Sequence, residues 1–211
     1  MRTRIKICGI TDAESAFAAA ESGADAIGFV FATSSPRYIE PEAAWEIAAI
    51  LPPFVSTVGL FVNAKPDAVD AVREKCAFDI TQLHGNEPEP VVRECLPPII
   101  KAIKFNPETI ELELRRWSTF ADIDAVLVDG STGGEGIAFD WNLLAEHADA
   151  CEHPLIIAGG LTAENVGEAI RIVRPWAVDV SSGVERERGR KDPDLIAAFC
   201  DAVRRADMNA G

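Results

Sequence analysis

The sequence predicts an α/β protein folded as one single-domain (β/α)8 TIM barrel over residues 1–211. Three observations predict it. Short β-branched runs recur eight times, a segment with apolar residues at helical spacing follows nearly every run, and no low-complexity linker interrupts the alternation. The length is near the lower end of the range for this fold. The alternative is an open doubly wound sheet, but the first turn reads CGITD instead of the glycine-rich GxGxxG of that class.

The predicted strands are short and rich in Val and Ile, as strands buried on both faces require. They are residues 4–8, 25–31, 56–62, 79–83, 99–105, 125–129, 154–158 and 177–181. Helical patterns between and after them include DAESAFAAAESG, PEAAWEIAAIL, KPDAVDAVREKC, TAENVGEAIRIV and DPDLIAAFCDAVRRA. These segments start with Thr, Asp or Pro, and several helices end near Gly, as helix capping predicts.

Composition excludes several classes of protein. The net charge of −14 argues against nucleic-acid binding, which needs a basic surface. No run approaches the roughly 18 apolar residues of a membrane span, and the N-terminus lacks a secretion pattern, so we expect a cytoplasmic protein without membrane contact. Five scattered cysteines without a CxxC pair predict neither a disulfide framework nor a zinc site.

In this fold the active site lies at the carboxyl ends of the strands, so the residues there are the candidates for chemistry. Two turns of small residues, AGGL after the seventh strand and SSGV after the eighth, occupy the usual phosphate-binding position. Each turn alone would be read as simple chain reversal. Together they predict an anion held by backbone N–H groups, which also solves the problem of binding an anion in an acidic protein. The predicted phosphate residues are Gly159, Gly160, Ser181, Ser182 and Gly183.

Cys8 and Asp129 are the candidate acid–base pair. Strand alternation places Lys6 and Cys8 on one face, and if that face is the barrel interior, Lys6 needs an anionic partner. Asp179 is the candidate, because the first and eighth strands close the barrel. A nearby cation lowers a thiol pKa, whereas the apolar run AVLV before Asp129 favours its protonated form. The alternatives without a catalytic role are that Cys8 is a small buried residue and that Asp129 only forms a turn.

Arg37 and His84 are candidates for binding. Arg37 follows the second strand in TSSPRYI, where a guanidinium could clamp a carboxylate; otherwise it is a surface arginine. His84 in QLHG is a base, a ligand or a bridge between loops, and no histidine cluster indicates a metal. Four cysteines in helices or at their ends are expected to be buried hydrophobic groups: Cys76, Cys95, Cys151 and Cys200.

Several motifs together resemble the phosphoribosylanthranilate isomerase family of tryptophan biosynthesis. They are KICGIT, GADAIGFVFATSSPRYI, TQLHGNE, GGEGIAFDW, IIAGGLTAENV and VDVSSGVE with KD shortly after. The resemblance is collinear over nearly the whole chain. The start K-[IV]-C-G-[IL]-[TK] with F-x-x-x-S-P-R is quite specific, whereas the glycine and serine turns occur in many phosphate-binding barrels.

The resemblance implies an Amadori rearrangement of N-(5-phosphoribosyl)anthranilate to 1-(2-carboxyphenylamino)-1-deoxy-D-ribulose 5-phosphate. It implies no metal and no organic cofactor, a small phosphosugar–anthranilate substrate as the partner, and a monomer or homodimer. Carried over by motif, Cys8 is the general base, Asp129 is the general acid, and Arg37 holds the anthranilate carboxylate. His84 and Asp179 are counted with the substrate-binding residues.

Two loops depart from the family pattern. The loop after the sixth strand usually reads G-G-[TS]-G-[KR]-x-F-D-W, and here Glu135 and Ile137 break that pattern. The segment RERGRKD after SSGVE lacks the usual proline before glycine.

Two other functions are compatible with parts of the sequence. Lysines on barrel strands carry Schiff-base aldolase chemistry, for which Lys6, Lys101 or Lys104 would serve. A non-catalytic phosphosugar-binding barrel would retain the anion turns, but the pairing of Cys8 with Asp129 at strand ends argues against it.

Overall fold

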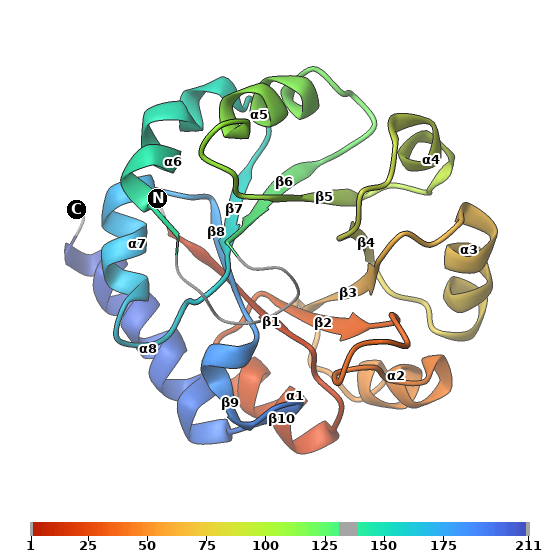
Figure 1. Cartoon of the computed structure of the whole chain (residues 1–211). Helices are drawn as coiled ribbons and strands as arrows, with labels where there is room; N and C mark the ends of the chain where they lie inside the picture. Colours follow the sequence, from red (N-terminus) through yellow and green to blue (C-terminus); the bar gives the residue numbers. More distant parts are fainter. Residues whose placement is uncertain (1, 131–138, 210–211) are drawn as a thin grey trace.

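The computed structural model describes residues 2–130 and 139–209, and it confirms the predicted barrel. Eight parallel strands close in sequence order, with β1 paired to both β2 and β8. Figure 1 looks into this ring of strands, with the helices packed around its outside. The loop that carries Glu135 and Ile137 lies outside the described residues.

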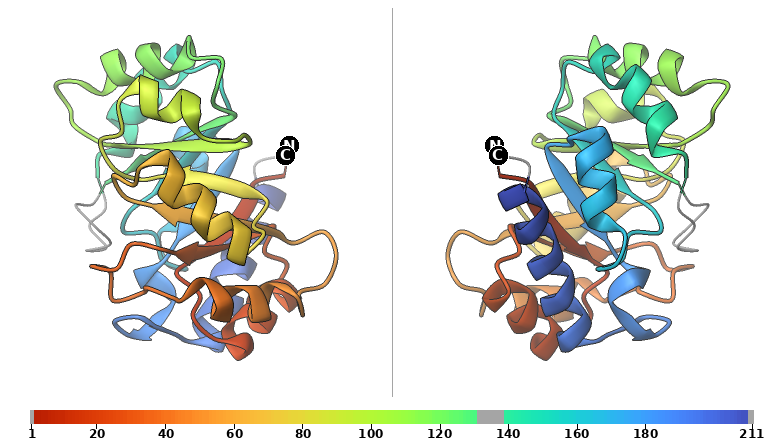
Figure 2. Two further views of the ribbon diagram at one scale, coloured as in Figure 1. Left: turned by 90° about the vertical axis from the view of Figure 1, so that its right-hand side faces the viewer. Right: turned by 90° about the vertical axis from the view of Figure 1, so that its left-hand side faces the viewer.

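The barrel strands are four to six residues long, and helices connect them. The strands are β1 (Arg4–Cys8), β2 (Ala26–Val30), β3 (Ser56–Phe61), β4 (Ile80–Leu83), β5 (Ile99–Lys104), β6 (Ala125–Asp129), β7 (Leu155–Ala158) and β8 (Ala177–Val180). The α-helices are α1 (Ala13–Glu21), α2 (Pro41–Ala48), α3 (Pro66–Lys75), α4 (Glu89–Glu94), α5 (Ile110–Ser118), α6 (Trp141–His147), α7 (Val166–Val173) and α8 (Pro193–Asn209). In the side views they run alongside the strands as one outer layer (Figure 2).

Short elements complete the chain. A 3₁₀ turn, η1 (Ala148–Ala150), follows α6, and a second, η2 (Ser182–Val184), follows β8. The segment expected only as a turn after β8 forms an antiparallel hairpin of β9 (Glu185–Glu187) and β10 (Arg190–Lys191). The sequence analysis did not anticipate this hairpin.

Each of three strands follows an aspartate whose side chain accepts a hydrogen bond from the backbone of the neighbouring strand. Carboxylate oxygens of Asp25, Asp79 and Asp124 accept the backbone N–H groups of Ile5, Thr57 and Ile99 at 2.7–2.8 Å. Side chains of this kind satisfy donors that the parallel ladder leaves unpaired at its start. β2 and β4 each begin one residue later than the sequence predicted, directly after Asp25 and Asp79.

The apolar core of the described residues has three parts, the smallest of which is formed by Cys8, Val30 and Leu60. Inside the barrel, residues from β5 to β8 form one cluster: Ile100, Ala102, Ala125, Leu127, Ile156, Ala158 and Ala177. A larger cluster fills the space between strands and helices, with Ile7, Ile27, Val126, Val178 and Phe199 among its fully buried members. Strands buried on both faces explain the runs of β-branched residues in the sequence.

No helix in the described part of the chain is both long and apolar enough to cross a membrane.

Candidate active site

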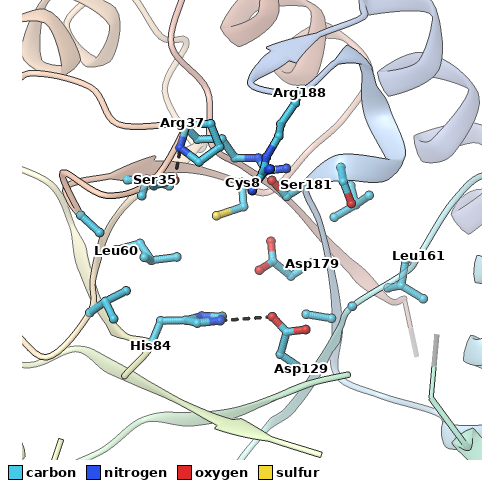
Figure 3. Close-up of a pocket in the computed structure, with 18 of the residues that line it drawn as sticks. Cys8, Ser35, Arg37, Leu60, His84, Asp129, Leu161, Asp179, Ser181 and Arg188 are labelled. Atoms are coloured by element: carbon cyan, nitrogen blue, oxygen red, sulfur yellow. Dashed lines mark hydrogen bonds and ion pairs between the residues drawn. The ribbon is translucent and has the colours of Figure 1, made fainter. Parts of the chain in front are cut away.

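A cavity of about 280 Å³ opens at the carboxyl ends of the barrel strands, and most predicted site residues line it. Those predicted residues are Cys8, Arg37, His84, Asp129, Gly159, Gly160, Asp179, Ser181 and Ser182. In Figure 3, His84 and Asp129 lie on one side, Arg37 and Arg188 lie on the other, and Cys8 and Asp179 lie between. The fold therefore gathers in one place side chains that are far apart in the sequence.

Cys8 ends β1 with its side chain inside the barrel, as strand alternation predicted. On the same face Lys6 Nζ donates to Asp179 Oδ1 at 2.9 Å, with both side chains nearly fully buried. The register pairs Lys6 with Asp179 on β8, so the predicted ion pair is confirmed. The positive charge of Lys6 also acts on the Cys8 thiol and lowers its pKa.

Gly28 makes room for this cluster. It stands opposite Cys8 on β2, and an added Cβ there would lie 2.9 Å from Cys8 Sγ and 3.1 Å from Lys6 Nζ. Any larger residue would push the thiol or the ammonium out of place. The sequence analysis missed Gly28, although a glycine inside a strand pattern signals a close approach of other atoms.

Burial raises the pKa of Cys8, against the expectation that a nearby cation would lower it. The positive charge of Lys6 does lower the pKa, but desolvation outweighs it and the negative charge of Asp179 adds to the rise. Desolvation also opposes the Lys6 ammonium, yet Asp179 and Cys8 together raise the pKa of Lys6. Burial also raises the pKa of Asp179, although the charge and the hydrogen bond of Lys6 oppose this rise. The contact between Lys6 and Asp179 therefore lies beside a thiol whose pKa is raised as well.

Asp129 ends β6 and is held by a chain of polar side chains from β4. Gln82 Nε2 lies 2.9 Å from His84 Nδ1, and His84 Nε2 lies 3.1 Å from Asp129 Oδ2. In the arrangement where the Gln82 amide donates to Nδ1, the proton of the ring lies on Nε2 and is donated to the carboxyl group of Asp129. Of the roles open to His84, the geometry favours orienting Asp129.

The loop that carries His84 is itself fixed by a buried ion pair. Lys101 Nζ lies 2.8 Å from Glu87 Oε2 and also donates to the carbonyls of Leu83 and Gly85, on either side of His84. Glu87 Oε1 accepts the backbone N–H groups of Asn63 and Gly85. Lys101 does not line the cavity that Cys8 lines. It lines a second cavity of about 640 Å³, together with Lys104, His84 and Asp129.

The turns after β7 and β8 meet closely where the phosphate site was predicted. A Cβ on Gly183 would lie 1.9 Å from the Leu161 carbonyl oxygen, so only glycine allows this contact. Gly183 itself does not line the cavity; it holds the two turns together. Lys191 Nζ donates to the Ser181 carbonyl at 2.9 Å and lies 3.2 Å from Ser181 Oγ, which places a positive charge behind the turn.

Arg37 is buried, and one edge of its guanidinium is already occupied. Its Nε and Nη2 donate to Glu185 Oε1 and Oε2 at 2.6 and 3.0 Å. Lys191 Nζ also contacts Glu185 Oε1, at 2.8 Å. Burial opposes ionisation of Glu185, but its two cationic partners outweigh this effect and lower its pKa. Arg37 is therefore a structured member of the site and not a free surface arginine.

The sequence analysis did not single out Glu185 or Lys191 as site residues. Both belong to the segments VSSGVE and KD that were quoted for the resemblance. A carboxylate and a lysine flanking an arginine-rich turn carry no periodicity that distinguishes them from solvated charges. Closure of the barrel, in which β1 pairs with both β8 and β2, brings them to Arg37.

The other cysteines behave as small core residues. Cys76, Cys95 and Cys200 are buried, Cys151 is half-buried, and all four are free thiols. Burial raises the pKa of Cys76 and that of Cys200 to about 11. None of the four lines the cavity.

Comparisons with known proteins find relatives that match nearly the whole chain. Residues 5–202 match the family model described as N-(5'-phosphoribosyl)anthranilate (PRA) isomerase. The N-(5'-phosphoribosyl)anthranilate isomerase of Dechloromonas aromatica is 45% identical over 98% of this chain and 99% of its own length.

Solved structures show the same similarity. The phosphoribosyl anthranilate isomerase of Thermotoga maritima has a TM-score of 0.89 and 43% identity, covering 96% of this chain and 98% of that one. A phosphoribosyl anthranilate isomerase in complex with reduced 1-(o-carboxyphenylamino)-1-deoxyribulose 5-phosphate has a TM-score of 0.86 and 42% identity, with the same coverage.

Proposed function

The chain belongs to the N-(5'-phosphoribosyl)anthranilate isomerase family, and on that premise we propose a reaction and a mechanism for its site. The reaction is the Amadori rearrangement of N-(5-phosphoribosyl)anthranilate to 1-(2-carboxyphenylamino)-1-deoxy-D-ribulose 5-phosphate in tryptophan biosynthesis. The observation that carries the proposal is that Cys8 and Asp129 line one cavity from separate strands. A furanose ring placed between them meets a base and an acid at once.

The first step is ring opening with Asp129 as general acid. Its carboxyl proton passes to the furanose ring oxygen, the C1–O bond breaks, and the lone pair of the anthranilate nitrogen forms an iminium at C1. Orientation matters because a general acid must lie within hydrogen-bond reach of its acceptor. His84 supplies that orientation through its contact with Asp129 Oδ2 at 3.1 Å.

The second step is proton abstraction with Cys8 as general base. The Cys8 thiolate removes the C2 proton, and the electrons of that bond neutralise the iminium to give an enolamine. Ketonisation then moves the C2 hydroxyl proton off oxygen and places a proton on C1, so the net change is an isomerisation. The positive charge of the Lys6 ammonium stabilises the thiolate while it exists.

The remaining residues bind the parts of the substrate that do not react. The turns at Gly159–Gly160 and Ser181–Ser182 hold the phosphate through backbone N–H groups, with Gly183 keeping the turns in register. Arg37 offers the carboxylate its free Nη1/Nη2 edge, since Glu185 holds the other edge. Asp179 acts through Lys6 in this scheme and does not hold the substrate directly.

A direct assay tests the proposal. Purified protein given N-(5-phosphoribosyl)anthranilate should convert it to the ketose, followed by loss of the substrate's anthranilate fluorescence. Borohydride added during turnover with an aldehyde substrate should leave no adduct on Lys6, Lys101 or Lys104. A trapped lysine adduct, or no turnover by the folded protein, would reject the acid–base isomerase and favour the aldolase or the binding barrel, respectively.

A further inference from the structure

Arg188 extends from the turn between β9 and β10 toward Arg37 and Ser181, and its side chain lines the catalytic cavity (Figure 3). It differs from Arg37 in two respects. Arg188 is exposed, whereas Arg37 is buried. Within the described residues, no carboxylate forms an ion pair with Arg188 and no acceptor takes a hydrogen bond from its side chain. Arg188 therefore presents a charged group with five donors to the cavity, and these donors have no hydrogen-bond partner among the described residues.

The turn that carries Arg188 is docked on the loop that carries Arg37. A Cβ on Gly189 would lie 2.7 Å from the Pro36 carbonyl oxygen, so the two backbones are in contact at this point. The Gly189 N–H donates to Glu185 Oε2 at 3.2 Å, and the adjoining Lys191 is anchored to Ser181. The base of Arg188 is thus fixed, and only its side chain has freedom to adjust.

Several negative charges at the cavity oppose the binding of an anionic ligand, and the positive charge of Arg188 would offset them. Glu185 compensates part of the charge of Arg37 and occupies its Nε/Nη2 edge. Asp129 and Asp179 also line the cavity, and the chain as a whole carries −14. A ligand with both a phosphate and a carboxylate would meet a repulsive field except where a local cation faces it.

We propose that Arg188 is a second positioning residue for the carboxylate of the substrate, acting with the free edge of Arg37. This inference rests on the proposed function. The backbone turns, with Lys191 behind them, already bind the phosphate in this scheme. The carboxylate is bound by the guanidinium of Arg37, one edge of which Glu185 already occupies. Charge-assisted contacts from two directions would fix the aromatic ring in its plane as well as bind it. Arg188 thereby selects substrates that carry a carboxylate.

The test compares two variants and two non-reacting ligands. Arg188→Gln removes the proposed contact, and Arg186→Gln removes an equal charge from the same hairpin at a residue that does not line the cavity. The ligands are reduced 1-(o-carboxyphenylamino)-1-deoxyribulose 5-phosphate and the same compound without the carboxylate, both measured by calorimetric titration at low and high salt. Kinetics with N-(5-phosphoribosyl)anthranilate provide KM and kcat separately.

We expect Arg188→Gln to weaken the carboxylate ligand about 10- to 100-fold, as loss of one or two charge-assisted bonds implies, with KM raised more than kcat is lowered. The ligand without the carboxylate should bind this variant as it binds the unaltered protein, and Arg186→Gln should change neither.

Three results would overturn the inference. The first is unchanged affinity of Arg188→Gln for the carboxylate ligand. The second is equal weakening of both ligands in this variant, which would assign Arg188 to the phosphate. The third is an equal loss of affinity in Arg188→Gln and Arg186→Gln, which would indicate only a long-range effect of charge. Failure of the proposed function looks different: the unaltered protein itself would then neither bind the carboxylate ligand nor turn over the substrate.

Discussion

Lys6 on β1 and Asp179 on β8 form a buried ion pair, with Nζ and Oδ1 2.9 Å apart, beside the thiol of Cys8. The pair is neutral as a unit, so ionising Cys8 adds a negative charge that nothing in the pair balances. Burial is the main cause of the raised pKa of Cys8; the charge of Lys6 opposes this rise, and the charge of Asp179 adds to it. The two charges of the pair act on the thiol in opposite directions, and each can be removed separately.

Asp179→Asn should lower the pKa of Cys8, and Lys6→Met should raise it further. Asp179 disfavours the thiolate and Lys6 favours it, so the two variants shift thiol ionisation in opposite directions. The pH dependence of Cys8 alkylation by iodoacetamide measures this shift. A variant with both changes serves as the control for the loss of the ion pair itself. Shifts in the same direction would mean that the charges do not act on the thiol as the geometry indicates.

Cys8→Ala should reduce kcat by roughly 10²- to 10⁴-fold, the contribution expected of a general base. Binding of reduced 1-(o-carboxyphenylamino)-1-deoxyribulose 5-phosphate should persist, because alanine retains most of the small side-chain volume. Cys76→Ala is the matched control, since Cys76 is fully buried but does not line the cavity. Normal turnover in purified Cys8→Ala would remove the thiolate from the mechanism.

Asp129→Asn should abolish most activity and change the shape of the pH profile. Turnover requires Asp129 protonated and Cys8 ionised together, so kcat/KM should follow a bell in pH. Asparagine keeps the contact with His84 but has no acidic proton for the ring oxygen. The limb at high pH should disappear with Asp129, and the residual rate should rise with pH as Cys8 ionises. An unchanged bell in this variant would refute the assignment.

Glu185→Gln should release the edge of Arg37 that the carboxylate now holds. We expect KM for N-(5-phosphoribosyl)anthranilate to rise more than kcat falls, because Arg37 binds a group that does not react. Glu187→Gln on the same hairpin is the control, because among the described residues the ion-pair partner of Glu187 is the exposed Arg190, at 3.2 Å. Equal kinetics in the two variants would show that Arg37 needs no orientation by Glu185.

Acid should destabilise the fold through Glu87 and Glu185. Burial opposes the ionisation of both, but their cationic partners and hydrogen bonds outweigh it and hold both pKa values below the usual 4.5. A lowered pKa contributes stability that is complete above pH 4.5 and is lost as the pH falls through the value in the folded protein. Urea unfolding over a pH series should show this loss. In Glu87→Gln and Glu185→Gln the slope should flatten, and an unaltered slope would contradict the assignment.

Local pattern was sufficient to predict the barrel and much of its site. Hydrophobic periodicity identified all eight strands, with β1 and β6 correct to the residue. Strand alternation put Lys6 and Cys8 on one face, and barrel closure then gave Lys6 its partner Asp179. Such features depend on neighbours in sequence or on a rule of the fold, which is why the chain reveals them without coordinates.

Other features depended on atoms that meet only after folding. The environment of Cys8 combines groups from β1, β2 and β8, and the balance between burial and charge there set the direction of its pKa against the expectation from sequence. The contact of Arg37 with Glu185 joins residues 148 apart in the chain. The sequence determined the fold, the strand ends and the chemical groups available at them. The tertiary structure decided which charges are paired and which stay uncommitted, because desolvation and distances of a few ångströms control electrostatics and neither can be read from residue order.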